Sequence, residues 1–229
     1  MQMKFVMPGL SLALVLAVAP VTLAQQPDKK PPKPPGATTV TMDAKPAIVV
    51  FSDATTLSGR LSDNKAGVTV RLEQDTTQPY GDSFTAAGSI AMTANSGMYS
   101  LTVKPLVNTQ YRVVAQASPP VTSAAKLVRV RMRVGLNVSD PTPARGSLVR
   151  FSGSVSPAHD GRTVYIQKRS STGRFATVSR TTLRDAGTAK STYSRRVRVS
   201  RDGVYRVKIL GDGDHINGFS RLRTLNVGG

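Results

Sequence analysis

The chain contains only two histidines, His159 and His215, and both stand close to aspartates. The neighbouring carboxylates are Asp160, Asp212 and Asp214. Imidazole and carboxylate groups together bind divalent cations, with oxygen ligands favouring calcium and imidazole favouring zinc. These five residues are a candidate metal site, and the sequence indicates no cofactor other than such an ion. The aspartates and nearby glycines also suit simple turns, and Asp-Gly at 212–213 is a strong turn dipeptide by itself.

A second group of residues has the types found in serine hydrolases. Gly81-Asp82-Ser83, with Asp212-Gly213-Asp214-His215 far downstream, superficially resembles the serine and Asp-x-x-His elements of GDS-type esterases. Those enzymes need alternating strands and helices to bring serine, histidine and an oxyanion hole together. Here Phe84 replaces the family's leucine, and the serine and histidine lie in different halves of the chain. We therefore predict that the protein is not an enzyme, and an esterase or metal-dependent hydrolase is the remote alternative.

The charge of the chain is unevenly distributed. The formal net charge is +18, and its segments carry +1 (residues 1–24), +2 (25–37), +4 (38–134) and +11 (135–229). The last segment holds 17 Lys and Arg against six Asp. Such a local excess predicts attraction to a polyanion, for which an acidic wall polymer, an anionic glycan, lipid headgroups and extracellular DNA are the candidates.

The N-terminal residues have the pattern of an export signal. Lys4 precedes an apolar run at 10–19, a Pro20 break and small residues up to Ala24, which predicts a signal peptide over residues 1–24. The run is too short to span a hydrocarbon core of roughly 30 Å. The following QQPDKKPPKPPG favours an extended spacer, residues 25–37. With no cysteine, the exported chain must be stabilised by its cores. We expect a secreted protein, extracellular or in the cell envelope, with no transmembrane segment in the mature chain.

An internal repeat determines the number of domains. A shift of 94 positions aligns Ser58-Gly59 with Ser152-Gly153, Tyr99 with Tyr193, and Tyr111-Arg112-Val113 with Tyr205-Arg206-Val207. A period near 100 residues is typical of a whole β-sandwich domain. We predict repeat 1 over residues 38–134 and repeat 2 over residues 135–229, with the boundary near 134–136.

Both repeats consist of short alternating segments separated by Gly, Pro, Asn, Asp and Ser, with no sustained helical period. In the second repeat we expect strands near residues 133–138, 148–155, 163–168, 175–181, 193–199, 204–209 and 221–227. Seven strands at this spacing form a two-sheet sandwich. The predicted fold class is all-β, with two tandem immunoglobulin-like or fibronectin-III-like sandwiches.

Three segments of the second repeat carry a family resemblance. Phe151-Ser152-Gly153-Ser154-Val155-Ser156-Pro157, Gly161-Arg162-Thr163-Val164-Tyr165-Ile166-Gln167 and Gly211-Asp212-Gly213-Asp214-His215 resemble the tandem bacterial Ig-like repeats of secreted, actinobacterial-type proteins. The resemblance covers most of residues 40–228. Because the chain lacks the cysteine pair and buried tryptophan of antibody domains, the resemblance implies the architecture and not a particular task.

The alternation also predicts a basic face on the second repeat. If Tyr205, Val207 and Ile209 face the core, the residues between them point outward. The predicted contact residues are Arg206, Lys208, Arg221, Arg223, Tyr165 and Gln167. Cations around a tyrosine and an amide can hold sulfate, phosphate or carboxylate groups while the ring packs on a sugar or base. The alternative is that these charges only keep exposed strands soluble and block edge pairing.

Two functions from different classes remain. The first is a non-catalytic binding protein whose basic repeat contacts an anionic wall polymer, a glycan or a membrane surface. The second is a structural spacer or assembly module that binds an envelope protein through sheet edges or loops. Binding to a polyanion weakens steeply with salt, whereas a packed protein interface does not.

Overall fold

The computed structural model describes residues 36–228, and every helix or strand in this range is a β-strand. The predicted signal peptide and almost all of the predicted spacer lie outside the described residues. Burial alternates strictly along strands such as β7 (Thr109–Ala115), where every second side chain is buried. A period of two places one row of side chains on the core and the other towards solvent. The all-β prediction is confirmed.

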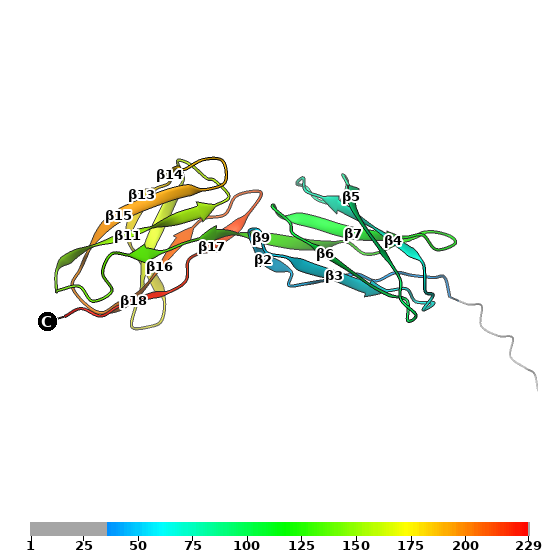
Figure 1. Ribbon diagram of the computed structural model, residues 1–229, viewed down its shortest axis with the longest axis horizontal. Helices are drawn as coiled ribbons and strands as arrows, with labels where there is room; N and C mark the ends of the chain where they lie inside the picture. Colours follow the sequence, from blue (N-terminus) through cyan, green and yellow to red (C-terminus); the bar gives the residue numbers. More distant parts are fainter. Residues whose placement is uncertain (1–35, 229) are drawn as a thin grey trace, which may run out of the picture. The chain divides into compact units, whose positions relative to one another are not determined.

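The first sandwich consists of two sheets (Figure 1). One contains, in order, β1 (Asp43–Lys45), β3 (Thr55–Arg60) and β6 (Met98–Val103). The other contains β5 (Thr85–Met92), β4 (Thr69–Asp75), β7 and β9 (Lys126–Val134), with β2 (Ile48–Val50) parallel to β9 and the short β8 (Val121–Thr122) on β7.

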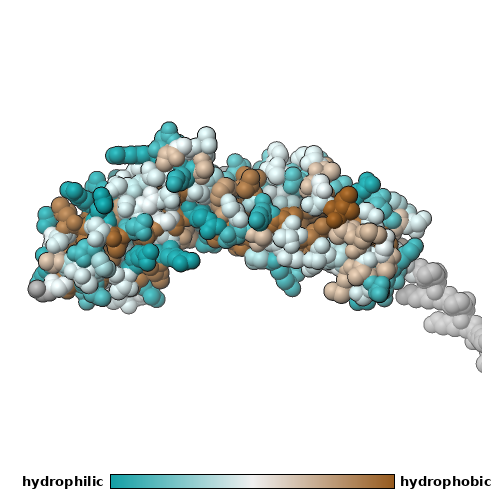
Figure 2. Space-filling model, in the orientation of Figure 1, coloured by the Kyte–Doolittle hydropathy of each residue, from teal (hydrophilic) through white to brown (hydrophobic). Residues whose placement is uncertain are grey.

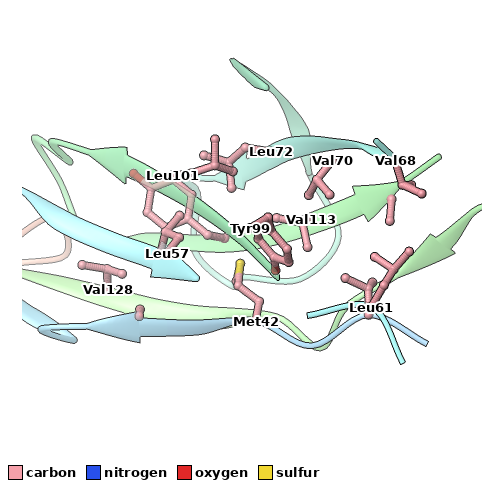
Figure 3. Close-up of a cluster of buried hydrophobic side chains, with 14 of the residues drawn as sticks. Met42, Leu57, Leu61, Val68, Val70, Leu72, Tyr99, Leu101, Val113 and Val128 are labelled. Carbon is pink, nitrogen blue, oxygen red and sulfur yellow. The ribbon is translucent and has the colours of Figure 1, made fainter. Parts of the chain in front are cut away.

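An apolar cluster fills the space between these two sheets. Leu57 and Leu101 contribute from the three-stranded sheet, and Val70 and Val113 contribute from the other. Figure 3 shows these side chains converging between the strands, with Tyr99 and Met42 among them. Because the chain has no disulfide, this burial of apolar surface is the main force that holds the sheets together.

The second sandwich repeats the arrangement. One sheet contains β10 (Asn137–Val138), β11 (Ser147–Ser156), β15 (Ser191–Val199) and β14 (Arg184–Asp185). The other contains β13 (Phe175–Thr182), β12 (Thr163–Arg169) and β16 (Gly203–Ile209), and β16 also pairs with β17 (Ile216–Phe219) and β18 (Arg223–Leu225). Their core contains Phe151, Ile166, Val207 and Leu225.

Strand β9 belongs to both halves. Its first part pairs with β7, and its last residues pair with β11 and, in parallel, with β17. Val130 belongs to the first apolar cluster and Met132 to the second. The apolar clusters therefore divide within this strand, two to six residues before the boundary that we predicted from the sequence; the ranges 38–134 and 135–229 remain a prediction.

A matching hydrogen bond occurs in each sandwich. The Tyr99 hydroxyl donates to the Thr41 carbonyl at 2.5 Å, and the Tyr193 hydroxyl donates to the Gly135 carbonyl at 2.6 Å. Each ring passes over a glycine of the intervening strand, and a Cβ on Gly153 would lie 2.2 Å from the Gly135 oxygen. Both bonds join positions related by the 94-residue shift, which explains the recurrence of glycine and tyrosine in the sequence.

The described part of the chain contains no helix with the length and apolar character needed to cross a membrane. In the view of Figure 2, hydrophilic residues are interspersed with neutral and apolar ones over the visible surface. This view shows no single hydrophilic patch, so the strand register is needed to find which cations lie next to one another.

Candidate functional site

The outer face of the sheet β13-β12-β16 places side chains in cross-strand rows. Lys208 lies opposite Tyr165, and Tyr165 lies opposite Arg180 on the other side. Directly opposed residues in antiparallel strands point to the same face. The alternate residues Val164 and Ile166 are fully buried in the core. The row of two cations with a tyrosine between them therefore faces outward.

The neighbouring row centres on Arg206. Its Nε donates to the Gln167 Oε1 at 2.9 Å, and its guanidinium carbon lies 3.8 Å from the centroid of the Phe175 ring and 4.5 Å from that of the Phe219 ring. Stacking on aromatic faces holds an arginine in place while leaving its charge intact. Burial lowers the pKa of Arg206, but arginine stays protonated in proteins. Within residues 36–228 its Nη groups have no hydrogen-bond partner, so they can bind an anion.

A shallow hollow of about 390 Å³ adjoins the first row. Two arginines, Arg180 on β13 and Arg195 on β15 of the other sheet, line it with Tyr165. The remaining lining residues are Thr163, Thr181 and Thr182. Guanidinium groups and hydroxyls are donors of the kind that binds phosphate, sulfate or carboxylate oxygens.

The other two predicted cations lie elsewhere. Arg223 is opposite Tyr205, whose side chain is in the core, so Arg223 does not share the face of Arg206. Its Nε instead donates to the Leu136 carbonyl at 3.2 Å. Arg221 lies in the segment between β17 and β18 and is exposed. The expectation that all four cations share one face is therefore corrected for Arg223: Arg206 and Lys208 share the face, and the place of Arg221 on it remains a prediction.

Few cations of the second sandwich are neutralised by acids. Among the described residues from 135 onward, Arg162 is the only arginine or lysine in an ion pair, and its partner is Asp212. Arg180, Arg195, Arg206 and Lys208 have no carboxylate within ion-pairing distance in the described part of the chain. Their positive charges therefore act on the solvent, where small anions of the salt and a polyanion compete to bind them.

The histidine cluster forms a second site. Ring centroids of His159 and His215 are 5.4 Å apart, and the ligand atoms of both histidines and Asp212 lie within 4.8 Å of one another. The His159 Nε2 is 2.9 Å from the Asp212 Oδ2, and the His215 Nδ1 is 3.4 Å from the Asp212 Oδ1. The loops after β11 and before β17 thus meet at one end of the sandwich.

Two of the predicted ligands remain outside this cluster. Asp160 accepts a hydrogen bond from the Ser191 hydroxyl at 2.5 Å. Asp214 is exposed, and its backbone N–H donates to the Asp212 Oδ1 at 3.0 Å. The structure therefore assembles three of the five predicted residues.

Asp212 is the centre of the histidine cluster. Partial burial opposes its ionisation, but a hydrogen bond from the His215 backbone N–H and the adjacent His159 ring lower its pKa. Arg162 Nη1 also donates to its Oδ2 at 2.5 Å. The carboxyl group is therefore ionised and surrounded by donors.

The esterase elements do not form a nucleophile and base. The Ser83 Oγ lies 3.1 Å from a carboxylate oxygen of Asp75 and 3.1 Å from one of Asp82, and its single hydrogen can be donated to either. His215 faces Asp212 and the Leu106 carbonyl. A serine nucleophile needs its base within hydrogen-bond distance, and the described residues provide none at Ser83.

Sequence reasoning missed Arg180, Arg195, Phe175 and Phe219. A period of two shows that Arg180 points away from the core, but strand pairing is needed to place it beside Tyr165. Arg195 comes from the opposite sheet, and only the packing of β13 near β15 brings it to the hollow.

Comparison with known proteins gives fold-level similarity alone. No family model and no curated protein matches the sequence. Similar solved structures include a tetra-tandem repeat of the extending region of a large adhesion protein (18% identity, TM-score 0.32, 82% of this chain and 49% of that one). Red sea bream transglutaminase (9%, 0.43, 83% and 31%) and bovine butyrophilin (11%, 0.38, 82% and 99%) are further examples. The chain thus spans half or less of the first two.

Proposed function

We propose that the protein is a non-catalytic binding protein of the bacterial envelope or exterior, and that the outer face of β13-β12-β16 binds an anionic polymer. The observation that carries the proposal is that the Arg206 guanidinium is held in place but not neutralised among residues 36–228. Two phenylalanine rings and Gln167 hold its guanidinium in place, and no carboxylate within the described residues neutralises it. Holding a charge in this way reduces the ordering cost of binding.

The spacing of the cations suits a repeating ligand. Adjacent strands lie about 4.8 Å apart, so Lys208 and Arg180, which are two strands apart, start from backbones about 10 Å apart. Arg206 continues the face along β16, and Arg195, on β15 of the other sheet, adds a cation at the hollow beside Arg180. A polymer with regularly spaced phosphate, sulfate or carboxylate groups can contact several of these cations at once.

Several contacts are needed because each exposed ion pair contributes little. An exposed pair is worth about 0–1 kcal/mol. Neutralising a polyanion at several points also releases condensed counterions, and the affinity then falls steeply as salt rises. For four contacts and a slope of about −0.7 per contact, raising salt from 50 to 200 mM should weaken binding by about 50-fold.

The test compares two variants with equal loss of charge. In the face variant, Arg180, Arg195 and Lys208 are replaced by glutamine. In the control variant, the exposed Arg145, Arg174 and Lys190 are replaced by glutamine. Arg206 is left unchanged because its side chain also packs in the sheet face.

Binding to inorganic polyphosphate and to phosphatidylglycerol vesicles is measured by co-sedimentation and fluorescence titration across a salt series. The proposal predicts that the face variant loses at least tenfold in affinity while the control variant keeps most of it. An equal loss in both variants would show that only net charge matters. Salt-insensitive binding, or none, would reject the polyanion face; vesicle binding without polyphosphate binding would assign it to a lipid surface.

A specific observation favours the alternative, an assembly module that binds an envelope protein. On β5, an edge strand of the first sandwich, Ile90 and Met92 are 62% and 65% exposed. Exposed apolar side chains on an edge strand are typical of a protein interface. Ile90→Lys would abolish partner binding in this case, and the binding would resist salt.

The remaining elements of the proposal come from the sequence. Export depends on the signal pattern of residues 1–24, which lies outside the described residues. The narrower resemblance to secreted, actinobacterial-type repeats is likewise part of the proposal. Detection of the protein in the culture medium or envelope fraction, with its N-terminus near residue 25, would support export and cleavage of the signal peptide.

A further inference from the structure

The two histidine rings at the junction of the sandwiches are fixed in orientation by backbone carbonyls. The Nδ1 of His159 lies 2.8 Å from the Pro157 oxygen, and the Nε2 of His215 lies 2.8 Å from the Leu106 oxygen. A carbonyl only accepts hydrogen bonds, so each of these nitrogens carries the hydrogen. The remaining nitrogens, Nε2 of His159 and Nδ1 of His215, are the ones that face Asp212.

The Nδ1 atom of His215 therefore lacks a hydrogen-bond partner that its buried position requires. The residue is 95% buried (5% exposed), and its Nδ1 has no hydrogen-bond partner. A neutral ring would direct a lone pair towards a carboxylate oxygen, an unfavourable arrangement for a buried group. A positive charge between the two rings and the carboxylate removes the conflict, and a metal ion satisfies both rings at once.

We propose that His159 Nε2, His215 Nδ1 and the Asp212 carboxylate bind a divalent transition-metal ion of the Zn²⁺ class. Two imidazole nitrogens and one carboxylate oxygen are a common set of zinc ligands, and a water would complete four-coordination. Hydrogen bonds from the second ring nitrogens to backbone carbonyls are the outer-shell partners that such histidines usually have. Nitrogen ligands disfavour Ca²⁺ and Mg²⁺, which prefer all-oxygen sites.

The proposed site is coupled to the first sandwich. The loop that carries Asp212 and His215 also receives hydrogen bonds from the Asn108 backbone N–H at 2.7 Å and from the Gln78 side chain at 2.6 Å. A metal on Nδ1 makes the opposite Nε2–H of His215 a stronger donor to Leu106. Metal binding therefore strengthens a contact between the loop before β17 and the segment that joins β6 to β7 in the first sandwich.

Arg162 is the feature that opposes metal binding. Its guanidinium contacts the same Asp212 Oδ2 that faces His159. A second cation at this oxygen competes with the metal ion for the carboxylate and repels it. Replacing Arg162 by glutamine should therefore tighten Zn²⁺ binding several-fold, an effect not expected if the cluster is only a structural ion pair.

Calorimetric titration of the chelator-treated protein with Zn²⁺ at constant pH is the direct test. We expect one ion per chain and normal affinity in Asp214→Asn, which removes the same charge two residues away. In His159→Gln and Asp212→Asn, which each remove a ligand, we expect affinity at least about 100-fold weaker, because loss of an outer-shell partner alone costs about 10- to 100-fold. At a Zn²⁺ concentration 100 times its Kd, the thermal midpoint should rise by about 5–10 °C.

The folding of each variant is checked by its unfolding curve without metal. If His159→Gln is unstable, Arg162→Gln still tests the proposal, because it is expected to gain affinity and not to lose it. Zn²⁺ binding that is absent, or that persists unchanged in both His159→Gln and Asp212→Asn, would overturn the proposal. An equal loss in Asp214→Asn would also overturn it by assigning binding to general negative charge.

Discussion

Replacing Tyr193 by phenylalanine tests how each sandwich is held together. The change deletes one hydroxyl, whose hydrogen bond to the Gly135 carbonyl is 2.6 Å long, and leaves a ring that is 97% buried (3% exposed) in place. A neutral hydrogen bond contributes about 0.5–1.5 kcal/mol net, and a stranded buried acceptor adds more. Because Gly135 is itself exposed, water can reach the carbonyl, so we expect a loss of about 1 kcal/mol.

Tyr99→Phe is the matched variant. Its hydroxyl donates to Thr41, which is also exposed, so the expected loss is again about 1 kcal/mol. Tyr99 and Tyr193 belong to separate apolar clusters, and the losses should add in the double variant to within about 0.5 kcal/mol. Urea unfolding followed by circular dichroism and tyrosine fluorescence measures all three values.

The same pair gives a second readout at high pH. Burial raises the pKa of both phenols above the ordinary value, which is about 10 in an unfolded chain. An acid whose folded pKa is raised contributes stability that is complete below the unfolded pKa and falls as pH rises above it. The double variant should therefore lose less stability between pH 9 and 11. Losses below about 0.3 kcal/mol in both single variants, or an unchanged alkaline profile, would refute the reasoning.

Three further changes have defined outcomes. Gly153→Ala places a Cβ 2.2 Å from a backbone carbonyl oxygen, so the free energy of unfolding should fall by about 2–3 kcal/mol; a change under 1 kcal/mol in urea unfolding would contradict this packing. Hydrogen bonds from the backbone N–H groups of Gly81 and Thr77 lower the pKa of Asp75, so its contribution to stability is present above the unfolded pKa of about 3.9 and is lost as pH falls below it. Asp75→Asn should remove much of the acid dependence in thermal melts from pH 6 to 2. Arg206→Met keeps the stem but loses two cation–π contacts, for an expected loss of about 1 kcal/mol in urea unfolding.

The alternating pattern predicted most of the second sandwich. The strand expected at 163–168 is Thr163–Arg169, and the one expected at 204–209 is Gly203–Ile209. The final strand is shorter than expected, because the predicted range 221–227 contains only Arg223–Leu225. The four-residue β17 was missed, since Ile216–Phe219 is too short for a period of two to stand out.

The sites were harder to predict because they depend on register and on contacts between sheets. Alternation along β16 predicted that Arg206 and Lys208 point outward, but the pairing of β18 placed Arg223 opposite Tyr205. The sequence did place His159, Asp212 and His215 in one candidate metal site. Nothing in the sequence indicated that Ser191 would engage Asp160 or that backbone carbonyls would fix both rings.

The central claim is that one face of the second sandwich binds an anionic polymer. Titrating the isotopically labelled protein with inorganic polyphosphate and following backbone amide and arginine Nε–H signals tests it residue by residue. The account predicts shifts concentrated on β12, β13 and β16 and at Arg195 on β15, with Arg180, Arg195 and Arg206 the most affected, and their reversal by 500 mM salt. Shifts spread evenly over all exposed cations, or confined to residues 38–134, would contradict it.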